Sequence, residues 1–168
     1  GGVVAVPKCR DCGSTSWTDE GRCSDCDSFP TFRFAAADWI ESYCVIPDRE
    51  DAGLPFRLTD EQLAIVLRHY RVNPHAVADK SSGKWMRAFH YERGTQITKP
   101  QKWGKAPVSA AFTCVEAAPD GPVLFDGWDA DGLPVGRSWA SPHVQVTACS
   151  EDQTDNVCTR VTPNKAQR

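Results

Sequence analysis

The sequence predicts an α/β fold that is preceded by a small zinc ribbon. Three observations lead to this expectation. Strand-like and helix-like stretches follow one another along the chain, and one strand-to-helix connection ends in Gly104-Lys105, as a phosphate-binding loop does. Two Cys-x-x-Cys pairs stand near the start of the chain. We therefore expect a three-layer domain with a mainly parallel sheet, in which the loop lies at a strand's carboxyl end.

The composition is that of a folded protein with a sizeable core. The 168 residues suffice for one domain of ordinary size plus an appendage, and 40% hydrophobic and 24% charged residues exclude wholesale disorder. A formal net charge of −3 argues against nucleic-acid binding by bulk charge but not against a local basic face. No run is apolar for long enough to span a membrane and no signal peptide is visible, so we expect a reducing compartment and no membrane association.

The two Cys-x-x-Cys pairs predict a structural zinc site. Cys9 and Cys12 form one pair, Cys23 and Cys26 form the other, and ten residues separate them. Each pair can present two thiolates from one tight turn, and two such turns complete a tetrahedron around Zn²⁺. Two disulfides or two redox-active pairs are the alternatives. The ribbon lacks a basic face, because many of its charged residues are acidic: Asp11, Asp19, Glu20, Asp25 and Asp27.

Hydrophobic periodicity and turn residues predict the remaining elements. A linker at 27–31 precedes helices at 34–46, from Thr59 onward, and at 108–118. Strands are expected at 85–91, 96–98 and 143–149. Residues 119–142 are rich in Gly, Pro and Asp, and we interpret them as a surface hairpin with an Asp-Gly turn rather than a calcium loop. The tail 158–168 is expected to be disordered.

The loop at 95–107 departs from the standard phosphate-binding pattern in two places. Lys99 stands where the first glycine is usual, and Ala106 replaces the Ser or Thr whose hydroxyl would hold magnesium. On pattern alone, a basic turn between a strand and a helix is the favoured interpretation. Gln62 is open to two interpretations as well. Thr59 and Gln62 have capping-box spacing, so local pattern favours a helix cap over a ligand-binding residue.

Four segments together resemble the large terminase subunit of tailed phages, in the style of phages that infect actinobacteria. They are 58–62, 85–93, 99–105 and 147–157. The resemblance covers roughly residues 39–157 in the family's order. It implies a RecA-like P-loop ATPase part, which powers DNA translocation into the capsid, with a nuclease domain following in the full family protein. ATP with Mg²⁺ is the implied cofactor.

The resemblance also assigns roles to individual residues. Gln62 matches the glutamine that contacts the adenine edge, and Lys105 matches the lysine on the β- and γ-phosphates. Gln101 and Lys102 match loop positions near the γ-phosphate, and Gly104 matches the close approach of the backbone. In addition, the segment 150–156 matches a stretch that packs near the nucleotide.

Other features depart from the family. Ala106 leaves magnesium to another group, for which Ser109 is the nearest hydroxyl along the helix. No apolar strand ending in Asp-Glu follows residue 157, and the nuclease domain is absent, so we expect weak ATP binding and poor hydrolysis. These absences and the missing initial methionine suggest a fragment, a frameshift or a split gene. An incomplete sheet would expose apolar surface, so we also expect poor solubility or self-association.

We therefore divide the chain into a zinc-ribbon head with its linker (1–31), a partial terminase ATPase domain (32–157) and a tail (158–168). The implied function is ATP binding in a DNA-packaging terminase of the host cytoplasm. The implied partners are double-stranded DNA, the portal protein and the small terminase subunit. The alternative is a non-catalytic zinc-binding module that contacts DNA or protein. A secreted or redox cysteine protein is a third hypothesis, which the terminase-like order of segments disfavours.

Overall fold

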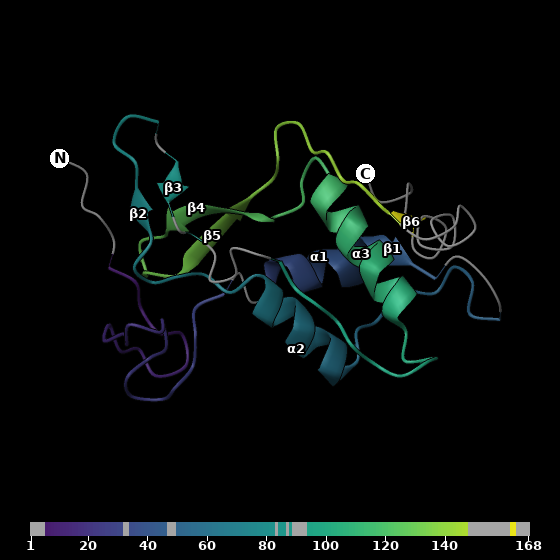
Figure 1. Ribbon diagram of the computed structural model, residues 1–168, viewed down its shortest axis with the longest axis horizontal. Coiled ribbons are helices and arrows are strands. Elements are labelled where there is room, and N and C mark those ends of the chain that lie inside the picture. The colour runs from purple at the N-terminus through teal and green to yellow at the C-terminus, as the bar shows by residue number, and fades with distance from the viewer. Residues whose placement is uncertain are drawn as a thin grey trace.

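The computed structural model describes residues 6–31, 34–46, 50–82, 84–86, 88, 94–147 and 162–163. They form a mixed α/β structure with three helices and three two-stranded sheets, all antiparallel (Figure 1). The helices are α1 (Ala35–Tyr43), α2 (Asp60–His69) and α3 (Lys105–Ala117). The strand pairs are β1 (Cys44–Val45) with β6 (Thr162–Pro163), β2 (Val77–Ala78) with β3 (Trp85–Met86), and β4 (Leu124–Trp128) with β5 (Pro134–Arg137).

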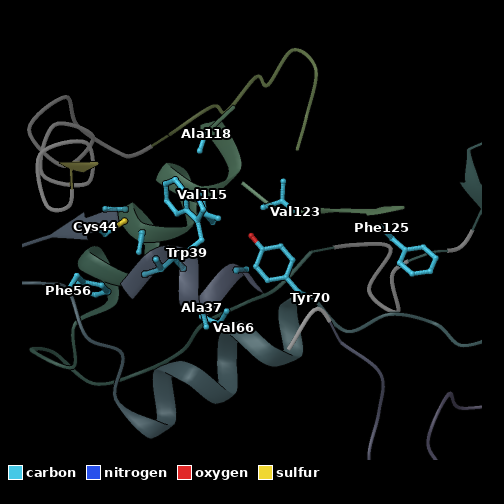
Figure 2. Packing of buried hydrophobic residues seen from close by; sticks show 14 of the residues in the cluster. Ala37, Trp39, Cys44, Phe56, Val66, Tyr70, Val115, Ala118, Val123 and Phe125 are labelled. Carbon is cyan, nitrogen blue, oxygen red and sulfur yellow. The ribbon is translucent and has the colours of Figure 1, made fainter. Parts of the chain in front are cut away.

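The main core lies between the three helices. α1 packs against both α2 and α3, and Figure 2 shows their apolar side chains converging. Ile40, Val66 and Val115, one from each helix, are at most 1% exposed. The indole of Trp39 donates a hydrogen bond to the Asp120 carboxylate at 3.2 Å, which ties α1 to the turn after α3. Burial of a side chain such as Ile40, Val66 or Val115 stabilises the fold by about 1.5–3 kcal/mol.

α2 begins with the predicted capping box. The Thr59 hydroxyl accepts from the Gln62 amide at 3.3 Å, and the Gln62 side-chain oxygen accepts from the Thr59 amide at 3.0 Å. Acidic residues follow in the first turn and basic residues in the last, as the helix dipole favours. The helix prediction from Thr59 is therefore confirmed.

The two hairpins lie beside the helices, on the left in Figure 1. Asp129 accepts backbone hydrogen bonds from Asp131 and Leu133 at 2.9 and 2.8 Å, which makes the turn between β4 and β5. This confirms the predicted surface hairpin. Gly127 in β4 has φ +114°, and a Cβ there would lie 2.9 Å from the Trp85 ring. The glycine thus lets the β2–β3 hairpin pack on β4.

Several strand predictions differ from the structure. No parallel pair occurs among the described residues, so the mainly parallel sheet is not present there. Residues 96–98 and 143–147 join no ladder. The first segment is short and polar, and it runs into Lys99-Pro100, where proline has no N–H to donate. The strand predicted from Trp85 begins there but is described only as far as Met86.

The first helix is shorter than the predicted 34–46. It ends at Tyr43, because Cys44 and Val45 turn to extended backbone and pair with Thr162 and Pro163. Thr162 and Pro163 are the residues of the predicted disordered tail, 158–168, that the structure describes. No helix in the described ranges is both long and apolar enough to cross a membrane.

Candidate functional site

The four predicted cysteines form one compact cluster. Their Sγ atoms all lie within 4.8 Å of one another. Two contacts join one motif to the other: Cys9 to Cys26 at 3.5 Å and Cys12 to Cys23 at 3.4 Å. A zinc tetrahedron with Zn–S bonds of about 2.3 Å has S···S edges of roughly 3.8 Å. The cluster therefore fits a single metal ion, and its sulfur atoms are too far apart for disulfides.

The two motifs have the same local backbone structure. The Cys9 amide donates to Ser14 and the Cys23 amide to Ser28, each at 2.7 Å. Gly13 and Asp27 occupy equivalent positions with φ +77° and +58°. Asp tolerates the left-handed region better than most residues, which explains how the second turn forms without glycine. Gly21 belongs to a separate turn at 18–21, in which its amide donates to the Thr18 carbonyl at 2.9 Å.

Hydrogen bonds favour the thiolate form of Cys9. Burial acts to raise the pKa of this thiol, but the Ser28 hydroxyl at 3.1 Å and the backbone amides of Asp11 and Cys12 lower it to about 6. Cys12 differs: the Ser14 amide acts to lower its pKa, but contacts with Cys23 and the other thiols raise it to about 12. Because thiolates are the metal-binding form, Cys9 is prepared to bind a cation at neutral pH.

The cysteine-bearing segment at 6–31, called the ribbon below, forms contacts with the rest of the molecule. Arg71, just after α2, donates to the Glu20 carbonyl at 2.6 Å and lies 4.9 Å above the Phe29 ring. On the other side the Lys8 amide donates to the Gly132 carbonyl at 2.9 Å, in the β4–β5 turn.

Part of the predicted linker, 27–31, also contacts α2. The Thr31 hydroxyl bonds the carbonyls of Leu67 and Tyr70 at 3.0 and 2.9 Å. Thr31 is buried, so the end of this segment packs against the helical core rather than serving as a loose connection.

The loop before α3 closes around the Lys105 ammonium group. Lys105 Nζ donates to the carbonyls of Lys99 and Pro100 at 2.7 and 2.8 Å. Gly104 is the N-cap in the left-handed region, with φ +97°, and Lys102 has φ +67°. The loop thus ends at a helix N-terminus, whose backbone N–H groups and dipole favour an anion. The helix itself begins at Lys105, three residues before the predicted start.

The structure brings Gln62 next to this loop. A Cβ added to Gly104 would lie 3.0 Å from Gln62 Nε2, so the glutamine amide lies against the Gly104 backbone. Gln62 is 7% exposed. The two interpretations of Gln62 therefore do not exclude each other, because its oxygen caps α2 while its nitrogen lies beside the N-terminus of α3.

Glu61 joins the same loop to the first turn of α2. Its carboxylate accepts from Lys99 Nζ at 2.7 Å and from the Trp103 indole at 2.5 Å. These hydrogen bonds, that from Lys99 first, lower the pKa of Glu61. Lys99 also lies 5.3 Å from the centre of the Trp103 ring. Local sequence patterns do not mark Glu61 or Trp103 as site residues, because 38 to 42 positions separate the partners.

The other predicted loop residues lie farther out. Gln101 and Lys102 are exposed, and Ser109 is exposed on α3. Ala106 offers no side-chain oxygen. Segment 150–156 lies outside the described residues.

Two curated proteins of mycobacteriophages resemble this chain. The Gene 13 protein of Mycobacterium phage L5 is 37% identical over 109 residues, which are 65% of this chain and 16% of that protein. The Gene 13 protein of Mycobacterium phage D29 is 34% identical over 144 residues, 75% of this chain and 22% of that protein. The chain thus spans about a fifth of the length of these relatives. No family model and no solved structure matches it. The chain is therefore related to bacteriophage proteins, as the resemblance implied.

Proposed function

We propose that this chain is the ATP-binding part of the large terminase subunit of a tailed phage. The observation that carries the proposal is the convergence of Gln62, Gly104 and Lys105 at the N-terminus of α3. A polar amide, a close backbone approach and an ammonium group are the parts that a nucleotide base and its phosphates require. Relatives in two mycobacteriophages support the phage setting.

In this proposal, binding uses groups already in place. The backbone amides of Lys105 and Ala106 and the Lys105 ammonium group hold phosphate oxygens, since Pro107 has no N–H to donate. Lys105 exchanges one of its two loop carbonyls for the ligand. The contacts of Glu61 with Lys99 and Trp103 keep the loop near α2. The Gln62 amide then faces the nucleotide from the helix cap. Lys102 and Gln101 at the exposed tip contribute further contacts to the phosphates.

The loop offers few oxygen ligands for a magnesium ion. In the described residues near the loop, Ala106 has no hydroxyl and the Ser109 hydroxyl is exposed, one turn farther along α3. We therefore derive no step through a metal ion at this loop. DNA translocation, and contacts with DNA, the portal protein or the small terminase subunit, are the parts of the proposal that rest on the resemblance.

Titration of the full chain with a fluorescent ATP analogue tests the proposal. Lys105→Ala should weaken binding by about tenfold or more, since a hydrogen bond to a charged group is worth about 1.5–3 kcal/mol. Gln62→Glu keeps the capping box but removes the amide N–H, so it should reduce the preference for ATP over GTP. Lys80→Ala, at an exposed lysine, is the control. Equal binding by wild type and Lys105→Ala would refute the assignment.

A non-catalytic zinc-binding module is the second candidate function. The four-cysteine cluster and its attachment through Arg71 and Lys8 support it. In this case the chain would bind structural Zn²⁺ and a DNA or protein partner, but no nucleotide. Three results with wild-type protein would favour this function over the first. The protein binds a short DNA duplex, this binding is lost when zinc is removed, and ATP binding is not saturable.

A further inference from the structure

A small cavity is lined neither by the four clustered cysteines nor by Lys105, although Thr95 at the start of the 95–107 loop borders it. It has a volume of ≈190 Å³ and opens between the end of α2, the last turns of α3 and the start of β4. Its lining includes His69, Tyr70, Glu116, Trp139, Val123 and Leu124. Figure 2 shows Tyr70 directed from the end of α2 toward the side of the core that carries Val115 and Val123. Neither the nucleotide proposal nor the zinc proposal uses these residues.

Glu116 supplies negative charge to this cavity. Its carboxylate accepts from the Tyr70 hydroxyl at 2.8 Å and from the Trp139 indole at 3.1 Å. Both donors are neutral, so they orient the carboxylate without cancelling its charge. Among the described residues, no lysine or arginine forms an ion pair with Glu116. Each carboxylate oxygen can accept a second hydrogen bond, which leaves Glu116 able to bind a cationic donor.

Three aromatic or imidazole rings line the same cavity as the carboxylate. The rings of His69 and Tyr70 meet edge to face at 4.8 Å, and Trp139 is 44% exposed at the mouth of the cavity. His69 Nδ1 lies 2.9 Å from the Thr95 hydroxyl. Burial lowers the pKa of His69, although the charge of Glu116 opposes this shift. The imidazole is therefore neutral at neutral pH and does not form an ion pair with Glu116. Aromatic faces attract cations, with Trp the strongest.

These features select one class of ligand. A carboxylate repels phosphate and other anions. One carboxylate is too few oxygen ligands for Ca²⁺ or Mg²⁺, which require six or more. The apolar walls formed by Val123 and Leu124 suit methylene groups. We propose that this cavity binds an alkylammonium group, with its N–H directed to Glu116 and its carbon atoms against the rings and Val123. The group comes from a free amine or from a lysine side chain of a protein.

NMR titration of the full chain tests this proposal. Butylammonium chloride is added at constant ionic strength while the Trp139 indole N–H signal is followed, and the Trp139→Leu spectrum assigns that signal. We expect a saturable shift that 1-butanol, the same chain without the charge, does not produce. Glu116→Gln should weaken binding by about tenfold or more. Glu20→Gln, at an exposed carboxylate of the ribbon, should leave it unchanged.

A second ligand separates the two sources of the amine. Binding of Nα-acetyl-lysine methylamide with affinity similar to butylammonium supports a lysine side chain, while binding of butylammonium alone supports a free amine. The proposal is overturned if butylammonium and butanol shift the Trp139 signal equally, or if neither ligand gives saturation. Because these comparisons use wild-type protein, they remain decisive even if Glu116→Gln loses the Tyr70 contact and folds poorly.

Discussion

The side-chain amide of Gln62 lies against the backbone of Gly104, although 42 positions separate the two residues. The contact joins the first turn of α2 to the N-cap of α3, so two helix N-termini meet at one place. The Glu61 contacts with Lys99 and Trp103 reinforce the same junction from the neighbouring position. The shape of the Lys105 loop therefore depends on α2 as well as on its own sequence.

This relationship predicts a specific cost for Gly104→Ala. Alanine at φ +97° is strained by about 1–2 kcal/mol, and its Cβ would force Gln62 to move and weaken the α2 cap by about a further 0.5–2 kcal/mol. We expect the free energy of unfolding to fall by the sum of both effects, as measured by urea denaturation. Nucleotide binding should weaken as well, because the loop changes shape.

Gly53→Ala is the matched control. Gly53 has a similar φ of +87°, but no atom of the described residues lies within 4 Å of its added Cβ. This variant should therefore show only the backbone strain of about 1–2 kcal/mol. If both alanine variants lose the same stability, Gln62 does not press on Gly104 in solution.

The cysteine cluster predicts one bound zinc ion per chain. Cys23→Ser should remove most of the zinc found by mass spectrometry of the purified protein, because one of the four thiolates is lost at a buried position. Cys114→Ala, outside the cluster, should keep full zinc content. Zinc retained by Cys23→Ser, or absent from wild type purified without chelators, would contradict the four-thiolate site.

Features whose signal is local could be predicted from the sequence. The Thr59–Gln62 capping box, the two Cys-x-x-Cys pairs and the Asp129 turn each depend on residues a few positions apart, and the structure contains all three. The expected parallel sheet was a different kind of inference, because pairing depends on distant partners. Short strands such as those at 77–78 and 85–86 carry too few residues to fix their direction from sequence.

The site was predictable to a similar degree. Motif spacing and family resemblance mark Lys105 and Gln62 as candidate nucleotide-binding residues, a role that stays a prediction, but the local pattern could not show that they lie together. Glu61 and Arg71 each act on partners 38 or more positions away. Such contacts are decided by how the elements pack, and the sequence around each residue carries no local signal of them.

Arg71 is predicted to hold the ribbon in place. Arg71→Gln removes the charged donor to the Glu20 carbonyl and the stacking over Phe29, at a position that is 6% exposed. We expect stability to fall by about 1–3 kcal/mol and amide hydrogen exchange in residues 14–26 to accelerate. Arg57→Gln is the control, because its ion pair with Glu41 is exposed and worth about 0–1 kcal/mol. Equal exchange in the two variants would show that Arg71 does not secure the ribbon.

His69 makes stability depend on pH near neutrality. Burial lowers the pKa of His69 in the folded protein below the ordinary 6.5. At pH values between the folded-state pKa and 6.5, the unfolded chain therefore binds more protons than the folded one. The contribution of His69 is therefore fully present above pH 6.5 and is lost as pH falls through the folded-state pKa. Urea denaturation between pH 7.5 and 5 should show wild type losing more stability than His69→Gln, which cannot take up that proton. The charge of Glu116 opposes the shift, so Glu116→Gln should steepen the loss. A wild-type profile parallel to that of His69→Gln would mean that the imidazole is solvated rather than buried against Tyr70 and Phe112.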